Sequence, residues 1–182
     1  FDDKAKLKLT RGINKIANSV GSTLGPSGRT VVIEDDFGNP HVTKDGVTVA
    51  NSIMLKNPVE NLGVAMMKQA AQQTASMAGD GTTTSIVLTQ AIIDCYNKWK
   101  GKEHSFRDIK AGIDIFKNHV ISILNDKSIE VDSNKLNNVS TISANNDKVL
   151  GGLISSAFEQ AGENGIVAME TSPTNDTYVD TV

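Results

Sequence analysis

Hydrophobic positions recur at helical spacing over much of the chain. Apolar side chains three or four residues apart predict a helix with one buried face. The clearest example runs from Phe106 to Leu124, where one set of apolar residues recurs in steps of three and four: Phe106, Ile109, Ile113, Phe116, Val120 and Leu124. We predict further helices over 3–21, 58–78, 82–99, 133–140 and 147–161.

Short β-branched stretches predict a small amount of β structure. Residues 30–34 are typical of a strand, and 41–43 of its return after a turn at 37–40. Residues 44–46 predict a second tight turn, and 166–170 a further strand. The fold class is therefore predicted to be mainly α with small β elements.

The chain changes character near residues 126–132, where short Asn- and Ser-rich stretches follow the long helices. We place a domain boundary there, with one domain over 1–128 and a second over 129–182. The final residues, 179–182, are typical of a strand in mid-course, and the first residue is Phe1. These ends indicate a fragment of a longer protein.

Composition argues against several classes of protein. With 18 basic and 21 acidic side chains, the chain has no excess positive charge to bind a nucleic-acid backbone. No apolar run reaches the roughly 18 residues of a membrane span, and no signal peptide is visible. The single cysteine, Cys95, cannot form an internal disulfide, which indicates a reducing, cytoplasmic compartment. Its place on an apolar helix face predicts a buried thiol.

Three glycine-containing loops are candidates for chemistry, and the first covers Thr23–Arg29. Its glycines let backbone amides approach an anion, and Arg29 adds positive charge. It lacks the Gly-Lys-Ser/Thr ending of a Walker loop. An ordinary helix-to-strand turn remains the alternative.

The second loop covers Thr43–Gly46. A carboxylate on a tight turn, here Asp45, can position a water molecule or a metal-bound ligand. The alternative is a plain hairpin turn, because Asp-Gly is a common turn dipeptide.

The third loop, Gly79–Thr84, carries the sharpest signal. Asp80 is a hard oxygen ligand suited to Mg²⁺, and three threonines open the helix that follows. The helix dipole, the unpaired first N–H groups and the hydroxyls together favour phosphate binding. Simple N-capping by Asp80 or Thr82 is the alternative.

Taken together, the loops resemble the group I chaperonins, the GroEL family. The matching stretches are "TLGPSGRTVVIED", "TKDGVTVA", "AGDGTTT", "TISANND" and "GENGIV", in register over essentially the whole chain. The resemblance implies a helical equatorial ATP-binding domain over 1–128, followed by the first part of an α/β intermediate domain over 129–182. The apical domain and both C-terminal half-domains lie outside this sequence.

The resemblance also implies roles for individual residues. The nucleotide would be bound by Thr23, Leu24, Gly25, Pro26, Lys44, Asp80, Gly81, Thr82, Thr83 and Thr84, with Ile142 and Ser143 near the adenine and ribose. Asp80 would hold Mg²⁺, and K⁺ would be surrounded by Thr23, Lys44 and Thr83. Asp45 would be catalytic, lying near the γ-phosphate and orienting the attacking water.

The implied function is that of an ATP-dependent chaperone subunit that encapsulates and folds unfolded polypeptides. Its partners would be a heptamer-like ring of identical subunits, unfolded client proteins and a co-chaperonin. The alternative is a chaperonin-like assembly protein or nucleotide-binding module without productive hydrolysis. In the family, a further aspartate beyond this sequence completes the hydrolytic site, so these 182 residues alone are expected to hydrolyse ATP poorly or not at all.

Overall fold

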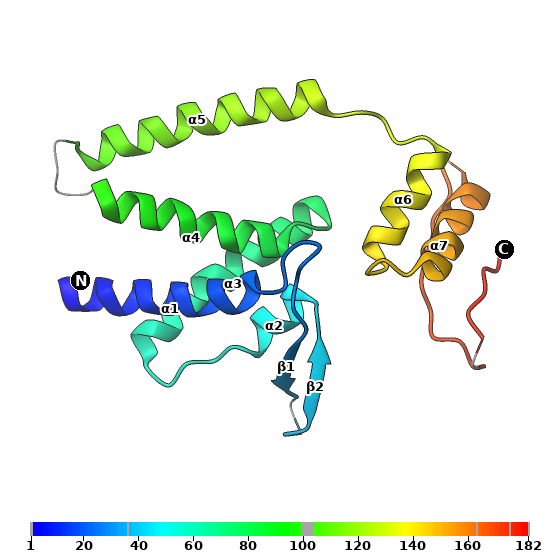
Figure 1. The fold of residues 1–182 in the computed structure, drawn as a ribbon, viewed down its shortest axis with the longest axis horizontal. Coiled ribbons are helices and arrows are strands. Elements are labelled where there is room, and N and C mark those ends of the chain that lie inside the picture. Colours follow the sequence, from blue (N-terminus) through cyan, green and yellow to red (C-terminus); the bar gives the residue numbers. More distant parts are fainter. Residues whose placement is uncertain (1, 36, 100–103, 163, 175, 182) are drawn as a thin grey trace. The chain divides into compact units, whose positions relative to one another are not determined.

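The computed structural model describes residues 2–35, 37–99, 104–162, 164–174 and 176–181. It confirms a mainly helical fold with a small two-stranded sheet (Figure 1). The chain divides into two compact units, Phe1–Asp114 and Ile115–Val182, each considered by itself below. The elements in chain order are α1 (Asp3–Gly21), β1 (Val31–Glu34), β2 (Pro40–Thr43), α2 (Gly46–Ser52), α3 (Pro58–Ala78), α4 (Thr82–Trp99), α5 (Phe106–Lys127), α6 (Ser133–Ser143) and α7 (Lys148–Ala161).

The core of the first unit lies where α1, α3, α4 and the short helix α2 meet. Its largest fully buried side chains come from all four helices: Ile16, Val20, Val49, Val64, Met67 and Ile86. Two glycines let α1 and α3 approach closely, since an added Cβ at Gly12 would overlap the Glu60 carbonyl and one at Gly63 the Leu9 carbonyl. Each buried aliphatic side chain stabilises this packing by about 1.5–3 kcal/mol.

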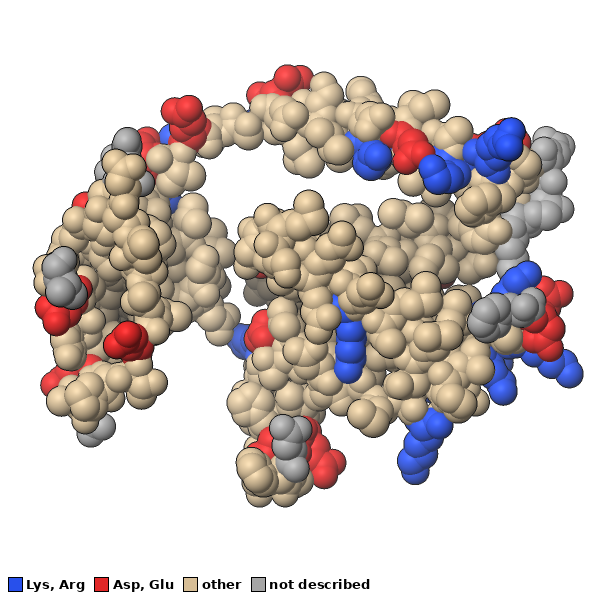
Figure 2. Space-filling model, turned by 180° about the vertical axis from the view of Figure 1, so that it is seen from behind, with Lys and Arg blue, Asp and Glu red and all other residues tan. Residues whose placement is uncertain are grey.

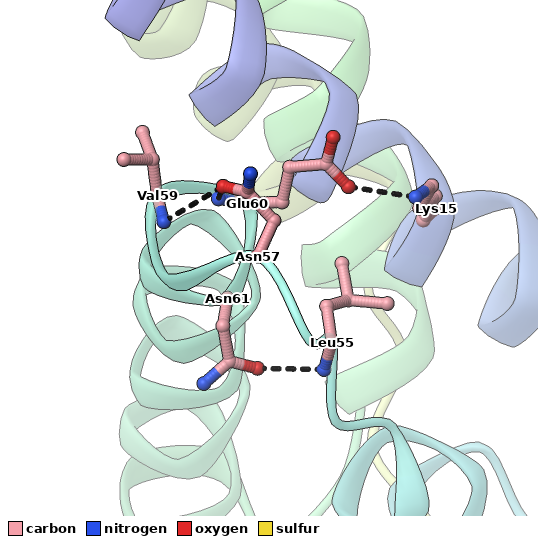
Figure 3. A network of polar contacts seen from close by, with 6 residues as sticks. All are labelled: Lys15, Leu55, Asn57, Val59, Glu60 and Asn61. Atoms are coloured by element: carbon pink, nitrogen blue, oxygen red, sulfur yellow. Dashed lines mark hydrogen bonds and ion pairs between the residues drawn. The ribbon is translucent and has the colours of Figure 1, made fainter.

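Polar contacts fix the start of α3 (Figure 3). Asn57 caps the helix by accepting from the N–H groups of Val59 and Glu60. Lys15 of α1 donates to Glu60 at 2.6 Å, and this hydrogen bond is the main cause of the lowered pKa of Glu60. Asn61 accepts from the Leu55 N–H at 2.9 Å and so ties the preceding connection to the helix.

The two strands form an antiparallel hairpin in the register Val31↔Thr43 to Glu34↔Pro40. Asp35 closes the turn by accepting from the N–H groups of Phe37 and Asn39. The hairpin starts just after the first loop and ends at the second. It therefore joins two of the candidate loops.

Two local predictions were wrong. Residues 44–46 were expected to form only a turn, yet Gly46–Ser52 form α2, whose seven residues are too short to show a helical period. The strand predicted at 166–170 is not formed in the structure. A strand requires a hydrogen-bonded partner, and within the described ranges this segment has none; Ile166 is 93% exposed.

The apolar faces of α4 and α5 are less buried than their sequence pattern predicted. Cys95 is exposed, so the prediction of a core thiol was wrong. The buried part of α4 is confined to Thr82 and Ile86, near its start, where it meets α1 and α3. Among the described residues of α5, none is buried.

The second unit consists of the part of α5 from Ile115 onward, α6, α7 and the segment after them, whose described residues form neither helix nor strand. The two helices pack closely because Gly151 lies against Thr141, where an added Cβ would overlap backbone atoms. Ser140 and Ser155 are buried at this contact. The compact units divide inside α5, and the domain boundary at 128/129 stays a prediction.

The surface agrees with the balanced composition. On the face drawn in Figure 2, charged side chains are separated by uncharged areas; nearly all the basic ones lie over the first unit, and acidic ones predominate over the second. In the described ranges, none of the helices combines the length and the apolar character that crossing a bilayer requires.

Candidate functional site

The first loop folds back onto the end of α1. Thr23 donates to the Val20 carbonyl both from its N–H, at 3.0 Å, and from its hydroxyl, at 2.8 Å. Gly25 has φ +77°, a conformation that favours glycine. An added Cβ at Gly28 would overlap the Thr23 carbonyl, so this glycine lets the loop close tightly. The turn fixes Thr23 and leaves Leu24, Gly25 and Pro26 exposed.

The second loop places Asp45 at the N-cap of α2. Its Oδ1 accepts from the Val47 N–H at 3.2 Å, and its Oδ2 accepts from the Thr48 N–H at 2.8 Å and the Thr48 hydroxyl at 2.5 Å. The Asp45 N–H in turn donates to the Thr43 hydroxyl. The plain hairpin turn is therefore wrong, because the loop leads from β2 into a helix.

These hydrogen bonds change the acidity of Asp45. Partial burial by itself raises the pKa of the carboxyl, since it removes solvent from the charged form. The donors on Thr48 and Val47 outweigh burial and hold the pKa of Asp45 below its ordinary value. Asp45 is therefore an ionised carboxylate at neutral pH.

The third loop connects α3 to α4 through two glycines in left-handed conformation. Gly79 has φ +74° and Gly81 has φ +85°. Asp80 lies between them at the surface, and its Oδ1 accepts from the Gly81 N–H at 2.6 Å. This bond lies outside the helix, so Asp80 does not cap α4.

The first turn of α4 is open. Within the described part of the chain, no hydrogen bond reaches the backbone N–H groups of Thr82, Thr83 or Thr84. Each of the six other helices has a side chain that accepts from its first turn: Asp2, Asp45, Asn57, Ser105, Asp132 and Asp147. Capping therefore does not explain the threonines, and the free N–H groups are suited to an anion.

Gly46 brings the three loops together. It is buried, and an added Cβ would overlap the Thr83 hydroxyl and lie 3.3 Å from Thr23 Oγ1. Thr23 belongs to the first loop, Gly46 to the second and Thr83 to the third. Hydroxyl oxygens, the Asp45 carboxylate and an open helix N-terminus are thus gathered in one region of the first unit.

The remaining predicted site residues stand apart from this cluster. Lys44 and Asp80 are exposed; Lys44 directly precedes Asp45, and Asp80 is separated from the open turn by Gly81. Ile142 and Ser143 end α6 in the second unit, and Ile142 is 70% exposed. Sequence reasoning missed Thr48: Asp45 is a typical N-cap residue, but the hydrogen bond from the Thr48 hydroxyl to its side chain has no sequence signature of its own.

Metal binding is limited by the ligands available. Within the described residues, no group of three or more His, Cys, Asp or Glu side chains could hold a metal ion. Asp80 offers a single carboxylate. That arrangement suits Mg²⁺ only when the phosphates of a ligand supply further oxygens.

Comparison with known proteins identifies relatives of this fold. The model of the TCP-1/cpn60 chaperonin family matches residues 16–180. Two crystal structures of the chaperonin gp146 from the bacteriophage EL 2 (Pseudomonas aeruginosa), in the presence of ATP-BeFx, are 29% identical to this chain. Their TM-scores are 0.77 for crystal form I and 0.75 for form II, over 90% and 87% of this chain.

A group III chaperonin in the open state is similar in fold, with a TM-score of 0.70 and 24% identity over 86% of this chain. The chain spans only 29% and 28% of the two phage chaperonin chains and 32% of the group III chain.

Proposed function

Since the chain belongs to the TCP-1/cpn60 chaperonin family, we propose that it is part of an ATP-dependent chaperone subunit that folds unfolded polypeptides. The observation that carries this proposal is the meeting of Thr23, Gly46 and Thr83, which joins three loops far apart in sequence. Phosphoryl transfer depends mainly on such positioning and on charge neutralisation. The phage chaperonin with the same fold was crystallised with ATP-BeFx.

The nucleotide is proposed to lie across the three loops. The open N–H groups and hydroxyls of Thr82, Thr83 and Thr84 donate to phosphate oxygens, and Gly81, whose own N–H is bound to Asp80 Oδ1, lets the phosphates approach the backbone. Residues 23–26 of the first loop pack beside them in this proposal, and Lys44 approaches from the second loop. Ile142 and Ser143 contact the adenine and ribose side in this proposal.

The metal ions fit the donors present. Asp80 is the proposed magnesium ligand, since its Oδ1 is fixed by the Gly81 N–H and the carboxylate faces solvent. The hydroxyls of Thr23 and Thr83, with the backbone oxygen of Lys44, form an all-oxygen set suited to K⁺. When bound, the two cations neutralise phosphate charge.

Asp45 is the proposed catalytic residue. Its lowered pKa keeps it ionised, so it can accept a hydrogen bond from a water molecule and orient it. Both of its oxygens are already held by Val47 and Thr48, which fixes the direction of their remaining lone pairs. The chain therefore supplies a rigid acceptor beside an open anion site.

The rest of the proposal concerns the whole protein. We assign the subunit to group I because the "GPSGR" and "TKDG" stretches have the group I form. It then forms a heptamer-like cytoplasmic ring that captures unfolded clients and uses a co-chaperonin.

The decisive experiment is single-turnover ATP hydrolysis by the complete gene product that carries this chain, with Mg²⁺ and K⁺. The Asp80→Ala variant is compared with Asp126→Ala, which removes an exposed aspartate at the end of α5. We expect hydrolysis that falls to background only in Asp80→Ala.

Other outcomes separate the alternatives. Tight ATP binding without turnover in the unaltered protein would favour an assembly protein or a nucleotide-binding module. Absence of both binding and turnover would overturn the ATP-driven function.

A further inference from the structure

The C-terminal end of α2 is held by a lysine from α3. Lys68 Nζ donates to the carbonyl oxygen of Asn51 at 2.9 Å. Asn51 lies in the last turn of α2, where carbonyl groups have no partner within the helix. A cation at this position also interacts favourably with the negative end of the helix dipole. Lys68 therefore stabilises the end of α2 opposite to Asp45.

Because α2 is short, a displacement of one end of the helix is expected to displace the other end as well. It has seven residues, about two turns, and a helix of this length persists only through its tertiary contacts. Those contacts are the Asp45 cap, the close approach of Gly46 to Thr83, the buried side chains of Val49 and Ala50, and the Lys68 bond. Loss of one contact is expected to loosen the others.

The surroundings of Lys68 indicate a specific contact. The side chain is partly buried, and burial lowers the pKa of its ammonium group. The group has thus given up part of its hydration to reach the Asn51 carbonyl. A methionine at this position would keep most of the aliphatic packing and remove only the donor and the charge.

We propose that Lys68 is a positioning residue: by holding the Asn51 carbonyl it fixes α2, and with it the Asp45 carboxylate, against the first turn of α4. The effect on hydrolysis rests on the function proposed above for the three loops. The effect on α2 itself does not.

The first test needs no nucleotide. Amide hydrogen exchange is measured over 43–55 in the complete gene product, in Lys68→Met, Lys68→Arg and Lys56→Met. Lys56 is an exposed lysine of the α2–α3 connection and serves as the matched control. We expect exchange about tenfold faster in Lys68→Met, as for loss of one charge-assisted hydrogen bond, with Lys68→Arg and Lys56→Met unchanged. Unchanged exchange in Lys68→Met would overturn the proposal, as would faster exchange spread equally over α3 and α7.

The second test measures ATP affinity and single-turnover hydrolysis in the same variants. We expect Lys68→Met to bind ATP with unchanged Kd and to hydrolyse it about tenfold more slowly, because the acceptor is displaced while the phosphate-binding groups remain. Lys68→Arg should restore the rate. A wild-type rate in Lys68→Met, or a parallel loss of affinity and rate, overturns the positioning role. If the unaltered protein neither binds nor hydrolyses ATP, the proposed function fails, and the exchange measurement still decides whether Lys68 fixes α2.

Discussion

Gly46 and Thr83 lie so close together that a methyl group on Gly46 would overlap the Thr83 hydroxyl. Gly46 is the first residue of α2, and Thr83 lies in the first turn of α4. Two helix N-termini are thereby brought into contact at a position where only a hydrogen atom fits. This contact sets how near the Asp45 carboxylate can come to the open N–H groups of α4.

Gly46→Ala is therefore expected to destabilise the protein. In an open helical position alanine is preferred over glycine by roughly 0.5–1 kcal/mol, but forcing a methyl into a packed contact costs about 1–3 kcal/mol. The midpoint of urea unfolding should fall. Gly112→Ala is the control, because an added Cβ there has no neighbour within 4 Å and should be neutral or stabilising.

A double mutant tests whether Thr83 is the residue that limits the space at Gly46. Thr83→Ala removes the overlapping hydroxyl, so Gly46→Ala should cost less in that background, with a coupling of about 0.5–3 kcal/mol. Strictly additive effects would mean that the two residues do not limit each other.

Thr48→Val is expected to raise the pKa of Asp45 toward its ordinary value, because it removes a hydroxyl donor and keeps the β-branched shape. Because the folded-state pKa of Asp45 is lowered, the ionised carboxylate increases the free energy of unfolding. The contribution of ionised Asp45 is complete above the unfolded value, about 3.9, and is lost as the pH falls through the lower folded value. In the variant the contribution is smaller, and its loss, which still begins near the unfolded value, is complete at a higher pH than in the parent. Acid unfolding followed by circular dichroism, with a carboxylate titration by NMR, measures it; coincident curves for variant and parent would contradict the role given to Thr48.

The sequence predicts most of the helices because their stability depends on local patterns. Apolar spacing, Pro58 at the start of α3 and Gly79 after its end predicted α3 with its observed bounds. For α2 no such pattern exists, since its seven residues are specified by the Asp45 cap and by tertiary contacts. For Cys95 the sequence pattern predicted too much burial. An apolar helix face predicts that some part of the face is buried, but packing decides which part is covered.

The three loops of the candidate site could be predicted from the sequence, but their meeting in space could not. Each loop could be recognised from its glycines, hydroxyls and carboxylates. Their meeting at Gly46 depends on the hairpin register and on the crossing of α1, α3 and α4, which no single motif encodes. The contact between Lys68 and the Asn51 carbonyl has no sequence signature, because the acceptor is a backbone atom 17 residues away.

Thr83→Val is expected to weaken K⁺ activation of hydrolysis. The substitution keeps the shape of the side chain and removes one of the proposed oxygen ligands. The K⁺ concentration for half-maximal rate should rise about tenfold, as for loss of one contact to a charged group. Thr89→Val is the control, since the Thr89 hydroxyl donates to the Ser85 carbonyl within α4. A lower rate with an unchanged K⁺ requirement would remove Thr83 from the proposed potassium site.

The Asp45→Asn variant distinguishes the capping role of Asp45 from its proposed catalytic role. Asparagine is as good an N-cap as aspartate, so its side-chain oxygen can still accept from the first turn of α2. It carries no charge and accepts a proton far less readily than a carboxylate. We therefore expect ATP binding to persist and single-turnover hydrolysis to fall by about 10²–10⁴-fold, the usual contribution of a catalytic acid or base.

The matched control is Asp35→Asn. Asp35 also accepts from two backbone N–H groups and its pKa is also lowered, but it lies at the hairpin turn, away from α2. Equal rates of hydrolysis in Asp45→Asn and Asp35→Asn would mean that Asp45 only caps α2. Another residue would then have to accept the hydrogen bond from the attacking water.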